Sequence, residues 1–322
     1  MKKKQMNSIM DLAAEAGVSY ATVSRVLNGR GRVSEEAKKS VLDAARKHQF
    51  RPRMQARRTS IAVVFNLSLS MQSDYFAFIF TAVMRHLALY DVAIELFSMN
   101  SIQTLASQMP DGIIAMPWDE RSRQIVEELS HPSARVLINN TGIRGFSSVA
   151  SDHYQGGVLA AEHLIAHGHS VCGLIVYNAA TWGNSERIRG FRETLERAGH
   201  KLESRLICDI DGSTLVDAAI RMKEATGVFV ANEGSGAEFC MTARSLGISI
   251  PDNLSVIAME APGVTKFTAP PLTAVVQPID AVAEKAVNLV MAQIAERDAG
   301  EPQTLLIANT LIERASIKHI GR

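Results

Sequence analysis

The sequence predicts a small all-α head that carries a helix-turn-helix, followed by an α/β core of two doubly wound lobes. Three observations predict this fold class. Residues 9–28 hold two short helical patterns joined by a tight turn, the chain is strongly basic up to position 60, and apolar runs alternate with helical patterns from position 61 onward. Alternating strands and helices are typical of βαβ units in mostly parallel sheets.

The first helical pattern begins after Ser8, whose hydroxyl can accept a hydrogen bond from an unpaired backbone N–H. The apolar residues that follow recur at steps of three and four, which places them on one helix face. They are Ile9, Leu12, Ala13 and Ala16. Gly17 stands at the predicted turn, where glycine adopts the left-handed conformation at the least cost.

The second helical pattern begins after Ser19, which can cap it. Val23, Val26 and Leu27 form its apolar face. Its start and its outer face therefore present Tyr20, Ala21, Thr22, Ser24 and Arg25. In a helix-turn-helix, the start of the second helix enters the major groove of DNA. The alternative interpretation is an ordinary pair of packed helices with a solvated polar face.

The distribution of charge favours a nucleic-acid partner for the head. Residues 1–60 hold fourteen Lys and Arg against five Asp and Glu, a net charge of +9. The rest of the chain holds 20 basic and 28 acidic side chains, a net charge of −8, so the overall charge of +1 conceals a basic head on an acidic body. Basic side chains bind polyphosphates by releasing counterions, so we expect the head alone to contact DNA.

The core begins with Ile61–Phe65, a continuous apolar run typical of a strand buried on both faces of a parallel sheet. Further strands are expected at residues 92–97, 112–116, 136–138, 172–176, 206–208, 227–230 and 255–259. Helices are expected at residues 75–90, 122–129, 155–166, 185–198, 215–223 and 237–246. A second set of elements begins near Asp152, which predicts two similar lobes. Ligands of doubly wound folds bind beyond the carboxyl ends of the strands, so we expect a small-molecule site in the cleft between the lobes.

Composition excludes several classes of protein. The 322 residues are 47% hydrophobic, and no apolar run approaches the ~18 residues that a membrane span needs. Asp11 and Glu15 interrupt any signal peptide, and three well-separated cysteines indicate a reducing compartment, so we expect a cytoplasmic protein. No G-x-S-x-G, P-loop or H-E-x-x-H motif occurs, so we expect no enzyme, no catalytic residue, no metal and no cofactor.

Several runs in the head resemble a known family. They are A-G-V-S at residues 16–19, T-V-S-R-V-L-N at residues 22–28, V-S at residues 33–34, and Pro52 with Ala56–Arg57 beyond them. Together they are similar to the DNA-binding head of the LacI/GalR family of bacterial transcription regulators. The resemblance continues through most of the core and implies a helix-turn-helix domain over residues 1–50, a hinge over residues 51–59 and an effector-binding core over residues 60–322.

The resemblance implies a repressor that binds a pseudo-palindromic operator as a homodimer. Base edges are expected to be contacted by Tyr20, Ala21 and Arg25, and phosphates by Ser19, Thr22, Ser24 and Asn28. The hinge departs from the family because it is several residues short, and Thr59 stands where an apolar wedge into the minor groove is usual. We therefore expect the hinge to hold DNA through Arg51, Arg53, Ala56, Arg57 and Arg58.

The core resembles periplasmic binding proteins, in which the chain crosses between the lobes three times. The crossings are expected near residues 150–151, 277–279 and 300–303. Lobe one would then hold residues 60–150 and 279–300, and lobe two would hold residues 151–278 and 301–322. The expected partner in the cleft is a small-molecule effector, a carbohydrate or a related metabolite.

Six positions match the effector pocket of the family: Tyr75, Phe76, Asp152, Arg187, Asn232 and Glu260. Glu233 and Glu260 replace the family's usual aspartates, which changes the depth expected of the pocket. Each position also has a structural interpretation. Tyr75 and Phe76 could be plain core, and Arg187 could pair with Glu186 or Glu193 on a solvated face. Trp118 and Trp182 could line the mouth of the cleft or serve only the fold.

Two alternatives to a ligand-controlled repressor stay open at this point. One is a solute-binding protein without a regulatory role, which the basic head and the lack of a signal peptide disfavour. The other is a regulator that needs no effector.

Overall fold

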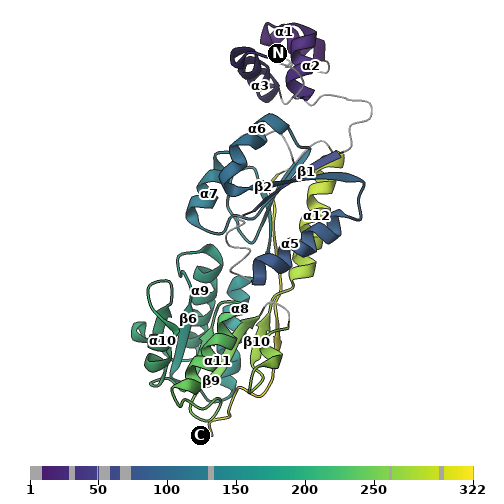
Figure 1. Cartoon of the computed structure of the whole chain (residues 1–322). Coiled ribbons are helices and arrows are strands. Elements are labelled where there is room, and N and C mark those ends of the chain that lie inside the picture. The colour runs from purple at the N-terminus through teal and green to yellow at the C-terminus, as the bar shows by residue number, and fades with distance from the viewer. Residues whose placement is uncertain are drawn as a thin grey trace.

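The computed structural model describes residues 9–28, 33–48, 50, 59–65, 74–129, 134–260, 263–296 and 301–321. It shows a helical head at one end, followed by two α/β lobes (Figure 1). The predicted fold class is confirmed: a helix-turn-helix head precedes a two-lobed core in which each lobe is built on a largely parallel sheet.

The head consists of α1 (Ile9–Ala16), α2 (Tyr20–Asn28) and α3 (Glu35–Lys47). Leu12 and Val23 are fully buried between these helices. Gly17 has a φ of 66°, as the predicted turn requires. The Ser19 hydroxyl accepts a hydrogen bond from the Thr22 N–H at 3.1 Å, which confirms the predicted cap of α2. Ser8, the predicted cap of α1, lies outside the described residues.

Two further contacts fix the third helix against the first. Ser34 caps α3 by accepting a hydrogen bond from the Ala37 N–H at 3.3 Å. The Ser40 hydroxyl donates to the Ala16 carbonyl at 2.8 Å, so it satisfies an acceptor at the end of α1 that the helix itself leaves open.

Within the described residues, the sheet of lobe one has the strand order β11-β5-β4-β3-β1-β2, with parallel pairing throughout. The strands are β1 (Thr59–Phe65), β2 (Val92–Ser98), β3 (Gly112–Ala115), β4 (Ala134–Ile138), β5 (Ser147–Ser151) and β11 (Thr304–Ile307). The helices are α5 (Asp74–Leu87), η1 (Met99–Thr104), α6 (Leu105–Gln108), α7 (Glu120–Glu127) and α12 (Ile279–Glu296).

The two faces of β1 explain its continuous apolar run. Ile61 and Val63 pack with α5 and α12 on one face of the sheet. Ala62 and Val64 pack with η1, α6 and α7 on the other face. Because both faces are covered by helices, every residue from Ser60 to Phe65 is buried, as expected for a central parallel strand.

The sheet of lobe two has the order β12-β10-β9-β8-β6-β7 among the described residues, and only the β10–β12 pair is antiparallel. Its strands are β6 (Cys172–Val176), β7 (Ile207–Asp209), β8 (Gly227–Val230), β9 (Ser255–Glu260), β10 (Thr273–Val276) and β12 (Thr310–Ile312). Its helices are α8 (His153–Ala166), α9 (Trp182–Arg197), η2 (Ser204–Leu206), α10 (Leu215–Met222), α11 (Ser235–Ser245) and η3 (Thr265–Phe267).

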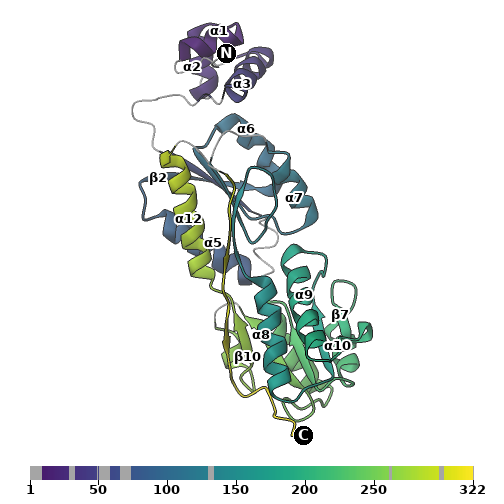
Figure 2. The ribbon, with the colours of Figure 1, turned by 180° about the vertical axis from the view of Figure 1, so that it is seen from behind.

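The chain passes between the lobes at Asp152, at residues 277–278 and at residues 308–309, as the change of sheet at these points shows. The third crossing was expected at residues 300–303, and that expectation is wrong. Thr304–Ile307 pairs in parallel with β5 and so belongs to lobe one. Figure 2 shows the C-terminal segment running in extended form from lobe one along lobe two.

The structure also corrects the hinge. Thr59 pairs with Val92 as the first residue of β1, so it belongs to the sheet of lobe one and not to the hinge. A side chain at position 59 therefore cannot insert as a wedge into the minor groove of DNA. Residues 51–58, which include the predicted hinge contacts, lie outside the described residues.

The described part of the chain contains no helix that is both long enough and apolar enough to span a membrane.

Two glycines let α8 and α9 cross in direct backbone contact. A Cβ atom at Gly190 would lie 2.1 Å from the Tyr154 carbonyl oxygen, and one at Gly157 would lie 2.1 Å from the Arg187 carbonyl oxygen. Because these obstacles are backbone atoms, neither site can accept a side chain without separating the helices. This contact fixes the positions of the residues that α8 and α9 present to the cleft.

We therefore predict that Gly190→Ala destabilises the protein by about 1–3 kcal/mol, since overpacking at a rigid contact forces the backbone to shift. Urea unfolding of the full chain would measure the change. Gly212→Ala is the matched control, because a Cβ at Gly212 meets nothing within 4 Å. Equal midpoints for the two variants would contradict the argument.

Candidate functional site

The outer face of α2 is open to solvent. Tyr20 is 57% exposed, and Ala21 and Arg25 are also exposed. Thr22 and Ser24 are half-buried, and the hydroxyls of Ser19 and Thr22 lie 2.9 Å apart at the start of the helix. The structure therefore places the predicted base-contacting residues together on one accessible face.

Other predicted DNA contacts cannot be placed. The side chain of Asn28 and the hinge residues lie outside the described part of the chain; the hinge residues are Arg51, Arg53, Ala56, Arg57 and Arg58. All these DNA-binding assignments stay predictions.

The head also contains a small charge network away from α2. The Glu15 carboxylate lies 2.7 Å from Lys47 Nζ and 3.0 Å from His48 Nε2. Hydrogen bonds from Lys47 and His48, together with the charge on Lys47, lower the pKa of Glu15 to about 2. The network ties the end of α1 to the end of α3.

A pocket lies between the two lobes, at the carboxyl ends of their strands. Lobe one contributes Tyr75, Trp118, Asn139 and Asn140. Lobe two contributes His153, Thr181, Trp182, Gly183, Asn184, Arg187 and Glu233. The cavity volume is about 20 Å³, so the pocket is nearly closed in this conformation. It lies where the doubly wound topology of both lobes predicts a ligand site.

Arg187 is the centre of the pocket on the lobe-two side. Its Nη1 donates to the Ala231 carbonyl at 2.6 Å and to Asn184 Oδ1 at 3.2 Å. Its Nη2 donates to Glu233 Oε1 at 2.6 Å and to Gln277 Oε1 at 3.4 Å. The side chains of Arg187 and Glu233 are each 4% exposed. The solvated pairing with Glu186 or Glu193 does not occur, because Arg189 makes those contacts instead.

Two buried atoms of the pocket residues have no hydrogen-bond partner within the described part of the chain: Arg187 Nε and His153 Nδ1. Burial, and then the positive charge of Arg187, lower the pKa of His153 well below its usual value. His153 is therefore neutral at physiological pH. Leaving a buried polar atom without a partner costs about 1–3 kcal/mol, so these two atoms point to a missing polar contact.

The lobe-one side of the pocket is aromatic and amide-rich. Asn139 takes the left-handed conformation (φ 52°) directly after β4. Its side-chain Nδ2 donates to the Tyr75 hydroxyl, and its side-chain Oδ1 accepts from the Ser151 N–H at 3.1 Å. Burial raises the pKa of Tyr75, so its hydroxyl keeps its proton. Phe76 is buried beneath Trp118, with ring centroids 5.1 Å apart. Tyr75 thus lines the pocket, while Phe76 packs behind it.

Besides Phe76, three predicted effector residues do not line this pocket. Asp152 caps α8 by accepting from the Gln155 N–H at 2.9 Å. Asn232 accepts from the Tyr177 N–H, so it holds the loop that leads to α9. Glu260 binds Arg314 at 3.1 Å and accepts hydrogen bonds from two backbone N–H groups of the loop after β9. Their side chains serve the frame of lobe two.

Sequence reasoning missed several lining residues. His153, Asn139, Asn140, Thr181, Gly183 and Asn184 enter the pocket without belonging to a recognisable motif. Their only sequence feature is their place directly after a strand or at the start of a helix, which is where doubly wound folds present ligand contacts. Trp118 and Trp182 do line the cleft, as one of the two interpretations expected.

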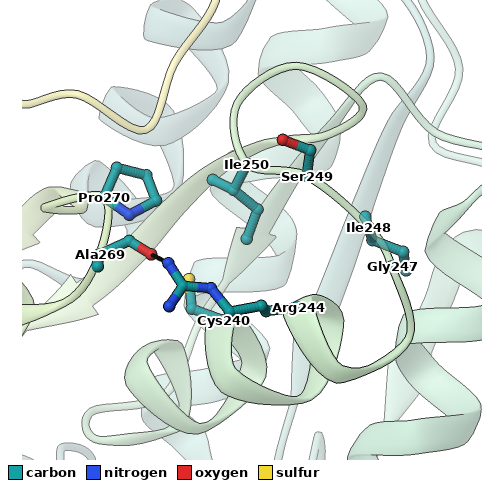
Figure 3. Close-up of a pocket in the computed structure, with 8 residues that line it drawn as sticks. All are labelled: Cys240, Arg244, Gly247, Ile248, Ser249, Ile250, Ala269 and Pro270. Carbon is teal, nitrogen blue, oxygen red and sulfur yellow. Dashed lines mark hydrogen bonds between the residues drawn. The ribbon is translucent and has the colours of Figure 1, made fainter.

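A larger cavity of about 270 Å³ lies elsewhere in lobe two, between α11 and the loop at Ala269–Pro270 (Figure 3). Arg244 Nη2 crosses it to donate to the Ala269 carbonyl at 2.7 Å. Cys240 lines the same cavity, and burial raises the pKa of its thiol to about 12. All the residues that line this cavity belong to lobe two, so its shape does not depend on the angle between the lobes.

A basic helix-turn-helix joined to a two-lobed core with a polar inter-lobe pocket defines the class of DNA-binding transcription regulators. Residues 8–53 match the model of the bacterial regulatory proteins of the lacI family, and residues 161–317 match the model of the periplasmic binding protein-like domain. The chain belongs to the LacI family of bacterial transcription regulators.

Individual relatives agree with this assignment. The chain is 27% identical to the HTH-type transcriptional repressor PurR of Mannheimia succiniciproducens, over 98% of this chain and 100% of the relative. It is 28% identical to the HTH-type transcriptional regulator DegA of Bacillus subtilis, over 84% and 87% of the two chains. Among solved structures, the transcriptional regulator CelR–cellobiose complex aligns with a TM-score of 0.71 at 25% identity, covering 97% of this chain and 100% of that one.

The buried ion pair in the pocket yields a stability prediction. Glu233→Gln should destabilise the protein by about 3 kcal/mol, because it leaves the buried Arg187 charge without its counterion. Glu203→Gln is the control: it removes one of the two carboxylates that pair with Arg205 in an exposed position, at 2.7 Å, and its loss should cost at most about 1 kcal/mol. Denaturant unfolding of both variants would compare them, and equal losses of stability would contradict the importance of burial.

Proposed function

We propose that this regulator is a repressor that binds a pseudo-palindromic operator as a homodimer and responds to a neutral, polyhydroxylated small molecule in the inter-lobe pocket. The observation that carries the effector proposal is the pair of buried, unpartnered atoms, Arg187 Nε and His153 Nδ1. Members of this family are in general not enzymes, and a cytoplasmic location is part of the proposal because the operator is the target.

The chemistry of the pocket favours a neutral ligand. The charge of Arg187 is already balanced by Glu233 at 2.6 Å, and His153 is neutral, so the lining carries no surplus charge for an ionic ligand to satisfy. The other groups that the pocket offers to a ligand include side-chain amides, a tyrosine hydroxyl and two indole rings. Planar aromatic faces with convergent hydrogen-bonding groups suit a carbohydrate or a related metabolite. CelR, in its complex with cellobiose, offers a related fold with such a ligand.

Entry of the ligand requires a change of shape. A site for a small molecule has a volume of about 300–1,000 Å³, whereas this cavity measures about 20 Å³. Because its lining comes from both lobes, the simplest way to enlarge it is to part the lobes. The ligand and the interlobe angle are then coupled, and the coupling cannot exceed the difference in the affinity of the ligand for the two conformations.

The DNA side of the proposal rests on the exposed face of α2. Arg25 carries the strongest potential for base recognition, because its guanidinium can donate two hydrogen bonds to one guanine. Tyr20 and Ala21 are exposed on the same helix. Ser19, Thr22 and Ser24 are the proposed phosphate contacts.

Arg25→Ala should weaken binding to the DNA upstream of the protein's own gene by about 1–3 kcal/mol, while binding to random DNA changes much less. Fluorescence anisotropy at fixed salt would measure both affinities. Arg205→Ala removes another exposed positive charge, from lobe two, and should change neither affinity. An equal loss on specific and random DNA would show that Arg25 contacts only phosphate.

The effector can be detected through the only two tryptophans of the chain, Trp118 and Trp182, because both line the pocket. We expect neutral sugars or nucleosides to change the tryptophan fluorescence and to alter DNA binding, and their phosphorylated forms to bind more weakly. His153→Phe should weaken the binding of the ligand about tenfold or more by removing its hydrogen bond.

Preference for a phosphorylated or carboxylated ligand would contradict the neutral chemistry of the pocket. If no metabolite changed both the fluorescence and the affinity for DNA, the alternative of an effector-independent regulator would replace this proposal.

A further inference from the structure

The C-terminal end of α8 meets the last segment of the chain in a cluster of histidines and one carboxylate. His163 lies on α8 and His167 is the C-cap of that helix, one turn further along, with the two ring centroids 4.4 Å apart. Glu313 follows β12, and its Oε1 lies 3.7 Å from His167 Nε2. One ring nitrogen of each histidine and one carboxylate oxygen all lie within 4.8 Å of one another.

The local hydrogen bonds orient these groups toward one another. His167 Nδ1 lies 2.8 Å from the His163 carbonyl oxygen, so Nδ1 donates to that carbonyl and Nε2 is left on the side of Glu313. A backbone carbonyl bound to one imidazole nitrogen is the usual arrangement when the other nitrogen binds a metal. The Ile320 N–H donates to the His167 carbonyl at 2.8 Å, which holds the C-terminal segment against the helix.

His163 adds an independent observation. Its Nε2 is shielded from solvent and has no hydrogen-bond partner within the described part of the chain. A shielded nitrogen without a partner costs free energy unless a further group contacts it. A neutral imidazole is the form that binds a metal. Two imidazole nitrogens and a carboxylate oxygen within 4.8 Å of one another form a set of ligands that a cation can bind.

We propose that His163, His167 and Glu313 bind one divalent transition-metal ion of the zinc class. Imidazole nitrogen and carboxylate oxygen are ligands that zinc accepts, and neighbouring ligands of a tetrahedral site lie about 3.3 Å apart. The pair at 3.7 Å is close to that value, and small side-chain rotations bring the third ligand in. His319, whose ring centroid lies 5.9 Å from that of His167, is the candidate for the fourth ligand.

The metal would brace lobe two at the end of α8 that lies away from the cleft. The other end of α8 begins at the first crossing, where Asn309 of the third crossing donates to the Asp152 carbonyl. The C-terminal segment links these two places, as Figure 2 shows by its course along α8. A metal between Glu313 and α8 would therefore fix both ends of the helix to the same segment.

The test is a titration of the full chain, free of any histidine tag, with Zn²⁺ in competition with a chromophoric chelator, followed by Co²⁺ absorption spectroscopy. We expect one Zn²⁺ per chain with micromolar or tighter affinity, and the visible bands of tetrahedral Co²⁺. Glu313→Gln should weaken the affinity at least about tenfold without unfolding the protein, because this side chain is 63% exposed. His163→Gln and His167→Gln should abolish binding.

His200→Gln is the matched control, since it removes a lobe-two histidine outside the cluster. The three cysteines do not compete, because each is buried and burial raises the pKa of its thiol. Absence of micromolar binding would overturn the proposal, and so would a loss in His200→Gln equal to that in Glu313→Gln. Unchanged affinity in His319→Gln would overturn its role as the fourth ligand. None of these outcomes depends on the effector or on DNA.

Discussion

Balancing a buried charge is the constraint on which the inter-lobe pocket depends. Arg187 is 3% exposed, and a guanidinium so placed must find its counterion and its acceptors within the protein. Glu233 supplies the charge, while Ala231, Asn184 and Gln277 supply the other acceptors. These groups come from the ends of β8 and β10 and from the start of α9. A single side chain thus fixes how the carboxyl end of the sheet meets the helix that covers it.

This arrangement depends on the backbone contact between α8 and α9. Gly157 and Gly190 bring the helices close enough for α8 to present His153 and for α9 to present Arg187 to the same cavity. The close approach also buries His153 and places the positive Arg187 near it; burial first, and then this charge, lower the pKa of His153 and keep the imidazole neutral. Packing, ionisation and hydrogen-bonding capacity in the pocket therefore have one structural origin.

The sequence was informative wherever a local pattern determines the structure. The apolar run at Ile61–Phe65 identifies a central strand because both of its faces are covered, and Gly17 identifies a turn because its φ is positive. β11 was misplaced because its residues are alternately exposed and half-buried, and nothing local tells which sheet it joins. Glu260 does not line the pocket because it binds Arg314, which lies 54 residues further along the chain. His153 and Asn139 could not be found, since only the meeting of the lobes brings them together.

The direction of the elements in lobe one suggests how a ligand in the cleft can affect the head. β1 begins at Thr59, directly after the segment that leads from the head, and ends at Phe65 near the cleft. α12 begins at the second crossing and runs back toward the head end (Figure 1). Ile61 and Val63 of β1 pack in one cluster with Val282 and Val290 of α12, so strand and helix move together. A close-packed body of this kind transmits a rotation with little internal deformation. A ligand that satisfies Arg187 Nε and His153 Nδ1 in only one interlobe arrangement would therefore shift the equilibrium toward that arrangement. The whole lobe, and with it the origin of the hinge, would then change position. The free energy of those few contacts limits how far the equilibrium can shift.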